Sequence, residues 1–252
     1  MLGEDTLLFT KDGLKKLKDL NLYDEVLTAF GDFEPIVEMG PWQECTKKVK
    51  ISTGEEFYCN DDTLWGVNKN TSCCDSFYYT DELENTYKFN KIKEFEGFGG
   101  SYEDEAYNYA VVIPKSVPNR YLLADINTRL AFLAGLIDSP MCMLGSNEGI
   151  YELYTRYDDL MRDIVTLLRS LALPLYISKH DGVWRIIIYM IKYIDIIPIQ
   201  DDLKDCYDYA GVGLNLSIND ICELKNDNKV MGRKIKVNRG SFLVGYSLIT
   251  VS

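Results

Sequence analysis

The chain has 252 residues, of which 46% are hydrophobic, and its 39 acidic and 27 basic residues give a net charge of −12. This length allows one large domain or two of ordinary size, each able to bury a core. The acidic balance argues against a protein whose whole surface grips a nucleic acid backbone, because lysine and arginine supply most of that affinity.

The start of the sequence and its cysteines indicate the environment that we expect. Residues 1–6 lack the charged and apolar regions of a signal peptide, and no apolar run is long enough for a transmembrane helix. The seven cysteines are odd in number and show no C-x-x-C spacing. We therefore expect an intracellular protein, cytoplasmic or nuclear, with reduced thiols and no membrane association. The single histidine, His180, argues against a zinc site, and its place beside Asp181-Gly182 favours a turn position over a general base.

The first part of the chain is typical of a compact all-β domain. Short apolar stretches at 25–30, 34–38 and 47–52 are separated by turn residues such as Gly31-Asp32. The segment 68–105 is polar and rich in tyrosine, so we interpret it as a loop-rich insertion. Ala110-Val-Val-Ile-Pro114 then predicts a further strand that ends at the proline.

From residue 125 the pattern changes to helices and hairpins. Leu130, Leu133, Ala134 and Ile137 recur at helical spacing and predict a helix. The glycine-bounded segment 145–149 predicts a hairpin.

A second helix is expected to begin at Asp158 or Asp159 and to end before Pro174, with a second hairpin at Asp181-Gly182. A short helix near 200–207 and further strands complete the chain.

The order of these elements predicts an α+β fold with two domains. An all-β beginning and an all-β end surround an α/β middle, which indicates one β domain built from both termini and a second domain inserted into it. We place the β domain at 1–118, including the loop-rich insertion 68–105, and at 208–252. The inserted domain, at 119–207, has the element order αββαββ.

Several segments resemble known families. The run Leu133-Ala-Gly-Leu-Ile-Asp138 resembles the helix motif of LAGLIDADG homing endonucleases. Met1–Thr6, Tyr23–Leu27, Leu168–Leu173 and Ser241–Val244 are similar to blocks of yeast vacuolar-ATPase-type inteins and of the related HO endonucleases. The resemblance implies a Hint (hedgehog/intein) domain formed by both termini, with a single LAGLIDADG-type domain inserted.

The resemblance also implies which positions would carry protein splicing: Met1, Asn60, Thr63, Val251 and Ser252. The family needs a thiol or hydroxyl at residue one, whereas Met1 has a thioether with no transferable proton. Its T-x-x-H block polarises the scissile carbonyl, and threonine is no acid or base near neutral pH. Its terminal His-Asn is replaced by valine and serine. Splicing is therefore expected to be lost, as in the HO branch, which also begins with Met-Leu.

Nuclease chemistry in the family needs two motif helices, each delivering a carboxylate to a divalent cation. Here one motif is visible, and the metal-binding position is Pro140. Asp138 remains, either as a helix-ending residue or as a metal ligand. We expect no cofactor, and Mg²⁺ only if cleavage is retained. Ala131, Ala134 and Gly135 keep a small-residue surface for packing in the core or against a second copy of the chain.

The predicted function is an intein-derived, homing-endonuclease-like protein that is defective in splicing and in DNA cleavage. The alternative is an HO-type protein that binds or cuts specific double-stranded DNA. One version of this alternative is a homodimer that forms through the motif helix. The candidate DNA contacts are the cations Arg156, Lys179, Arg185, Lys192, Lys229, Arg233, Lys234, Lys236 and Arg239.

Overall fold

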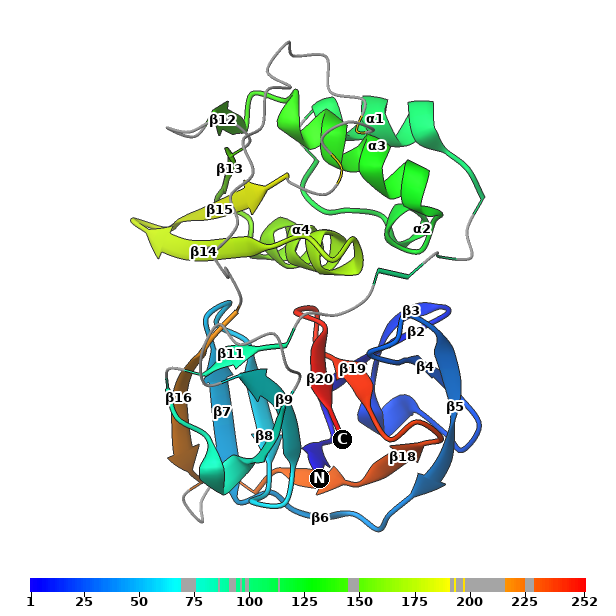
Figure 1. Ribbon diagram of the computed structural model, residues 1–252, viewed down its shortest axis with the longest axis vertical. Helices are drawn as coiled ribbons and strands as arrows, with labels where there is room; N and C mark the ends of the chain where they lie inside the picture. Colours follow the sequence, from blue (N-terminus) through cyan, green and yellow to red (C-terminus); the bar gives the residue numbers. More distant parts are fainter. Residues whose placement is uncertain are drawn as a thin grey trace. The chain divides into compact units, whose positions relative to one another are not determined.

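The chain folds into two compact units. The computed structural model describes residues 1–68, 76–85, 87–90, 94, 95, 97, 100–112, 114–144, 150–190, 193, 197, 216–224 and 229–252. The terminal unit comprises Met1–Lys93 and Asn215–Ser252, and the inserted unit comprises Glu94–Leu214. The predicted α+β architecture, with a β unit formed from both ends of the chain, is confirmed (Figure 1). None of the helices within the described ranges is long and apolar enough to span a membrane.

The terminal unit consists of antiparallel strands in two sheets. One sheet has the order β16-β7-β8-β1-β17-β6, and the other has the order β10-β9-β20-β19-β2-β4-β5-β18. The strands are β1 (Leu2–Gly3), β2 (Leu7–Thr10), β3 (Gly13–Lys16), β4 (Glu25–Leu27), β5 (Phe33–Met39), β6 (Gln43–Glu44), β7 (Lys47–Ile51), β8 (Glu56–Cys59), β9 (Leu64–Asn68), β10 (Phe77–Tyr79), β11 (Lys88–Phe89), β16 (Ile218–Glu223), β17 (Met231–Arg233), β18 (Ile235–Val237), β19 (Phe242–Val244) and β20 (Ile249–Val251), with the short turns η1 (Leu17–Asp19) and η2 (Thr80–Glu82).

An aromatic cluster lies in the core of the terminal unit. The Trp65 ring is fully buried between Phe57 and Phe89, with ring centroids 5.7 Å and 6.4 Å away in edge-on geometry. Such edge-to-face pairs add to the free energy gained by burying the rings. The indole nitrogen donates a hydrogen bond of 2.9 Å to the Thr80 hydroxyl, so the polar atom is satisfied. This cluster fixes β9, the strand that leads out of the candidate site described below.

The inserted unit is a four-stranded antiparallel sheet with helices. Its elements are α1 (Glu103–Val111), α2 (Asn119–Leu122), α3 (Ile126–Ile137), β12 (Cys142–Leu144), β13 (Ile150–Thr155), α4 (Asp158–Ser170), β14 (Leu175–His180) and β15 (Val183–Tyr189). The strand order within the sheet is β12-β13-β15-β14. Along the chain, the elements from α3 to β15 have the predicted order αββαββ. Burial alternates along β13 and β15, which is the period of a strand with one face in the core.

Local sequence explains where the helices of the inserted unit begin. Asp125 precedes α3, and its carboxylate accepts a hydrogen bond of 2.7 Å from the Thr128 amide, as an N-cap residue does. In α4 the apolar residues lie on one face, whereas Asp158 and Asp159 occupy the first turn, where the helix dipole favours negative charge.

The sequence prediction was wrong for the segment before α2. Residues 110–112 do not form a strand, because α1 runs through Val111, with Ala106 and Ala110 buried and Ala110 close to Gly135 of α3. The segment 68–105 is likewise more than a loop, since it contains β10, β11 and the start of α1.

Because α1 packs within the inserted unit, the boundary falls after residue 93 rather than after residue 118. The return to the terminal unit comes at residue 215, not 208. The expected turn at 145–149 and the helix near 200–207 lie outside the described residues.

A half-buried carboxyl on α4 gives the inserted unit a pH-dependent stability. The Val117 amide donates a hydrogen bond of 2.7 Å to Asp163, yet burial raises the pKa of this carboxyl from 3.8 to about 6. The nearby Asp159 carboxylate also raises this pKa, and Arg162 lowers it. The folded chain binds this proton more tightly than the unfolded chain, so protonation of Asp163 stabilises the fold. The stabilisation is complete below the unfolded pKa of 3.8 and is lost as pH rises through the folded pKa of about 6.

We expect Asp163→Asn to be more stable than the unsubstituted chain at pH 7, by about 1 kcal/mol after allowance for partial exposure. Asparagine keeps an oxygen for the Val117 amide and carries no charge. Denaturant unfolding at pH 4 and pH 7 measures the effect, and the advantage should shrink at pH 4. An advantage of equal size at both pH values would contradict the assignment.

Candidate functional site

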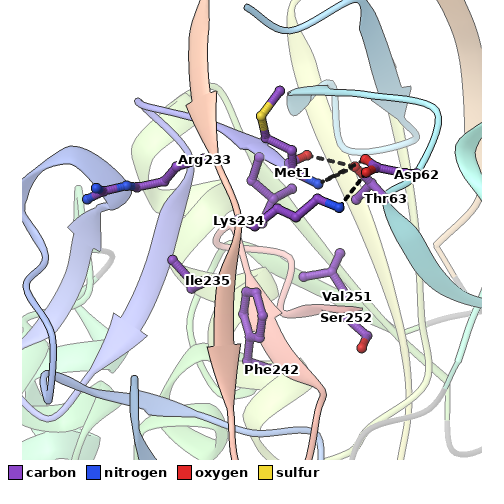
Figure 2. A pocket seen from close by; sticks show the side chains of 10 residues that line it. Met1, Asp62, Thr63, Arg233, Lys234, Ile235, Phe242, Val251 and Ser252 are labelled. Carbon is purple, nitrogen blue, oxygen red and sulfur yellow. Dashed lines mark hydrogen bonds and ion pairs between the residues drawn. The ribbon is translucent and has the colours of Figure 1, made fainter. Parts of the chain in front are cut away.

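Strand pairing brings the two ends of the chain together in one cleft. Strand β1 lies between β8 and β17, and β20 lies between β19 and β9, which begins directly after Thr63. The hollow that results has a volume of about 180 Å³. Figure 2 shows the side chains that line it. We call it the terminal cleft; it is lined by Met1, Leu2, Asp62, Thr63, Arg233, Lys234, Ile235, Phe242, Val251 and Ser252. Four of the five predicted splicing positions thus meet in one place.

The Thr63 hydroxyl holds the main chain of Met1. It accepts a hydrogen bond of 2.9 Å from the Met1 amino group and donates one of 2.7 Å to the Met1 carbonyl oxygen. The Asn60 amide donates to the same hydroxyl at 3.4 Å. These contacts orient residue one through its backbone. They provide no proton transfer, because a threonine hydroxyl does not ionise near neutral pH.

Asp62 supplies a negative charge in the terminal cleft and was missed by the sequence analysis. Its carboxylate lies 2.5 Å from the Lys234 ammonium and 3.6 Å from the Met1 amino group (Figure 2). The hydrogen bond from Lys234 lowers the pKa of Asp62, and burial lowers the pKa of the Met1 amino group. Its place directly before Thr63 was the sequence feature that could have identified Asp62. The ion pair with Lys234 could not be predicted, because Lys234 is distant in the sequence.

Val251 and Ser252 line the C-terminal side of the cleft. The Ser252 amide donates to the Leu64 carbonyl at 3.1 Å, and its hydroxyl donates to the Gly240 carbonyl. Serine has no side-chain amide that could cyclise. Asn60, the fifth predicted position, does not line the cleft, since its side-chain oxygen accepts a hydrogen bond of 3.0 Å from the Thr46 amide.

Two cysteines near the cleft are buried thiols. Burial raises the pKa of Cys45 to about 11 and the pKa of Cys59 to about 12. The thiolate is the nucleophilic form of cysteine, and at neutral pH almost none of it would be present. Neither thiol is therefore a ready nucleophile in the folded protein.

The acid retained in the motif helix is engaged by a tyrosine. Asp138 follows α3 as its C-cap, and the Tyr107 hydroxyl donates a hydrogen bond of 2.9 Å to its carboxylate. Burial, followed by this hydrogen bond, raises the pKa of Tyr107 to about 12. The tyrosine thus remains a donor over the physiological pH range. Sequence analysis gave no sign of this contact, because Tyr107 lies in the segment that it assigned to no helix.

Pro140, two residues after Asp138, does not fit a magnesium ion. Pro140 lines a separate hollow whose seven lining residues include no carboxylate. Magnesium prefers several oxygen ligands, usually with one or two carboxylates. In the described part of the chain, no group of three or more His, Cys, Asp or Glu side chains could hold a metal ion.

The small-residue face of α3 packs against α1 of the same chain. A Cβ atom at Gly135 would overlap the Tyr107 carbonyl oxygen and would lie 2.8 Å from the Ala110 Cβ. Ala131 and Ala134 are also buried. The face that a homodimer through the motif helix would use at Gly135 is therefore already covered by α1.

Most of the cations predicted to contact DNA are paired with acids. Such pairing reduces the positive charge available to phosphate groups. The pairs are Arg185–Glu152 at 2.5 Å, Lys179–Asp158 at 2.9 Å, Lys229–Glu44 at 2.6 Å, Lys234–Asp62 at 2.5 Å and Arg239–Glu34 at 3.1 Å.

The remaining candidates differ from one another. The Arg233 guanidinium lies 4.4 Å from the Trp42 ring centroid and donates to the Gly40 carbonyl at 3.2 Å. Arg156 and Lys236 have no ion-pair partner among the residues that the structure describes. Lys192 lies outside those residues.

Comparisons with known proteins gave one family match and several matches to solved structures. A family model described as homing endonuclease matches residues 116–185. The MchDnaB-1 intein structure has a TM-score of 0.43 and 10% identity, covering 100% of this chain and 98% of that one. The Msm DnaB1 intein splicing domain, described as bound with zinc, has a TM-score of 0.44 and 10% identity, covering 99% and 98%.

At these TM-scores the likeness to the intein structures establishes neither fold nor activity. No curated protein matches the sequence. The family match covers α2, α3, the four-stranded sheet to the first residues of β15, and α4. The inserted unit thus contains a segment, residues 116–185, of the homing endonuclease type.

Proposed function

We propose that this chain is an intein-derived protein of the LAGLIDADG homing-endonuclease type that has lost both protein splicing and DNA cleavage. One observation carries the proposal. Met1, Thr63, Val251 and Ser252 line a single cleft in a β unit built from both termini, as the splicing ancestry requires. This convergence supports the proposed ancestry, and the side chains of Met1 and Thr63 lack the groups that splicing would need.

Loss of splicing is tested by placing the chain between two flanking reporter domains. We expect no ligated reporter, because Met1 cannot attack the preceding carbonyl and Ser252 cannot cyclise. An active intein between the same reporters is the positive control. Any ligated product from the unsubstituted chain would refute this part of the proposal.

Loss of cleavage is tested on a randomised duplex library with magnesium or manganese. We expect no double-strand breaks, since Pro140 replaces a metal ligand and Tyr107 engages the Asp138 carboxylate. Sequencing of new ends detects any cut. Breaks that disappear in Asp138→Asn would contradict the proposed loss and would support an active enzyme.

The second candidate is an HO-type protein that binds specific double-stranded DNA. The family match to residues 116–185 favours it, because DNA is the substrate of homing endonucleases. Against it stand the net charge of −12 and the ion pairs of the candidate cations. Duplex DNA affinity measured from about 50 to 200 mM salt separates the DNA-binding candidate from the defective protein. Several phosphate contacts would make this affinity fall by orders of magnitude over the range. We expect a shallow dependence on salt.

The homodimer belongs to this second candidate. With α1 against Gly135, formation of the dimer through the motif helix would require α1 to leave its place. Sedimentation with and without duplex DNA measures the oligomeric state, and we expect a monomer in both. A dimer that forms only with DNA would favour the second candidate.

A further inference from the structure

A second hollow lies within the inserted unit, beyond the C-terminal end of α3. It has a volume of about 340 Å³ and lies between β12 and the connection from β13 to α4. A volume of this order can hold a small planar molecule. We call it the motif-end hollow; its lining residues are Pro140, Met141, Met143, Tyr154, Thr155, Arg156 and Tyr157.

Large apolar side chains are exposed at the rim of the motif-end hollow. Met143 is 61% exposed and Tyr157 is 48% exposed. Their exposure together leaves apolar surface in water that a ligand could cover. Thioether sulfur contacts aromatic rings favourably, and tyrosine rings stack against other planar rings. The walls therefore suit a flat ring.

The charged side chain that lines the motif-end hollow is Arg156. Arg156 is exposed and, unlike Arg185 and Lys179, has no acidic partner within the described residues. The Lys115 ammonium lies 6.0 Å from the centroid of the Tyr157 ring. None of the lining residues carries a carboxylate, and Glu152, which accepts a hydrogen bond from the Tyr154 hydroxyl, is paired with Arg185. Arg156 therefore makes the hollow favour an anion over a metal ion.

We propose that the motif-end hollow binds a planar aromatic anion. The ring contacts Met143, Tyr154 and Tyr157, and Arg156 forms charge-assisted hydrogen bonds to the anionic group. Two sources have this chemistry: a nucleotide, whose anion is a phosphate, and an aromatic acid, whose anion is a carboxylate. The proposal is independent of splicing and of DNA cleavage.

The test is calorimetric titration of the full chain with adenosine 5′-monophosphate and, separately, with indole-3-acetate. We expect saturable binding of at least one of them, with the preferred probe distinguishing phosphate from carboxylate. Adenosine has no anionic group and inorganic phosphate has no ring. Each should bind at least about tenfold more weakly than adenosine 5′-monophosphate.

Two substitutions assign the binding to the motif-end hollow. Arg156→Gln is expected to weaken binding about tenfold or more, because the charge-assisted hydrogen bonds to the anionic group are lost. The matched control is Arg162→Gln, an exposed arginine on α4 that pairs with Asp159 and does not line the hollow. This control should bind like the unsubstituted chain. Tyr157→Ser should weaken binding through loss of the ring contact.

Three results would overturn the proposal. One is the absence of saturable binding for both aromatic anions. Another is an equal loss of affinity in Arg156→Gln and Arg162→Gln, which would indicate general charge attraction. The third is equal binding of inorganic phosphate and adenosine 5′-monophosphate, which would show that the rings contribute nothing.

Discussion

Replacing Arg129 with methionine is expected to lower the free energy of unfolding of the inserted unit by about 3 kcal/mol or more, since each buried carbonyl left without a donor costs about 1–3 kcal/mol. The Arg129 side chain is fully buried about one helical turn before the motif. Its guanidinium donates to the carbonyls of Ala124 and Ser170, both at 3.1 Å, to the Ser170 hydroxyl at 2.8 Å, and to the Phe95 carbonyl. One side chain thus joins the start of α3, the end of α4 and the segment at Phe95.

Methionine has a similar length but no donor, so the carbonyls would lose their partners. Hydrogen exchange at increasing urea concentration, read on amides of the inserted unit, measures the change. Arg120→Met is the matched control, because that arginine is exposed and forms a surface pair of 2.6 Å with Glu105. The control should lose far less stability than Arg129→Met, because an exposed ion pair contributes little to folding. Equal losses in the two variants would refute the role assigned to Arg129.

The substitution Gly135→Ala is expected to destabilise the inserted unit by about 1–3 kcal/mol, as overpacking of a close contact does. Its sign is informative, because helix propensity alone would make alanine more stable than glycine by about 1 kcal/mol. The added Cβ would meet the backbone of α1 at Tyr107, which cannot move aside as a flexible side chain could. Gly135→Leu should prevent α1 from docking altogether.

Thermal unfolding of both variants measures this effect. Gly40→Ala is a suitable control, since its Cβ would have only ordinary contacts of 3.5 Å or more with Lys234. A stabilised Gly135→Ala variant would mean that α1 and α3 do not approach closely. In that case the small-residue face would be open, and a homodimer through the motif helix would again be possible.

Periodicity in the sequence was sufficient for the elements whose residues interact locally. The helix α3 follows from its apolar spacing and from Asp125 as its N-cap, and the hairpin of β14 and β15 follows from Asp181-Gly182. The helix α1 was missed because Val111 and Val112 favour strands. What makes the segment helical is the packing of Ala106 and Ala110 against α3, a contact that no local pattern reveals.

The candidate sites divide in the same way. Met1, Thr63 and Ser252 were grouped through a family resemblance, and pairing of β1, β9 and β20 explains why they meet. The side chains that pair with the candidate residues, and so change what those residues can do, were not predictable. Glu152 neutralises Arg185 from 33 residues away, and Tyr107 engages Asp138 from 31 residues away. Charge counts along a sequence contain no information about such long-range pairs.

The central position of β1 and β20 also sets the order in which the protein can form during synthesis. Strand β1 needs β17 as a neighbour, and β9 needs β20, yet both partners leave the ribosome only after the whole of Glu94–Leu214. Strands β1 and β9 therefore keep unpaired edges during synthesis, while the inserted unit is already able to fold. Non-local pairing of this kind is slow and exposes the waiting edges to other chains. The nascent N-terminal strands, rather than the finished protein, are the stage at which chaperones would matter most.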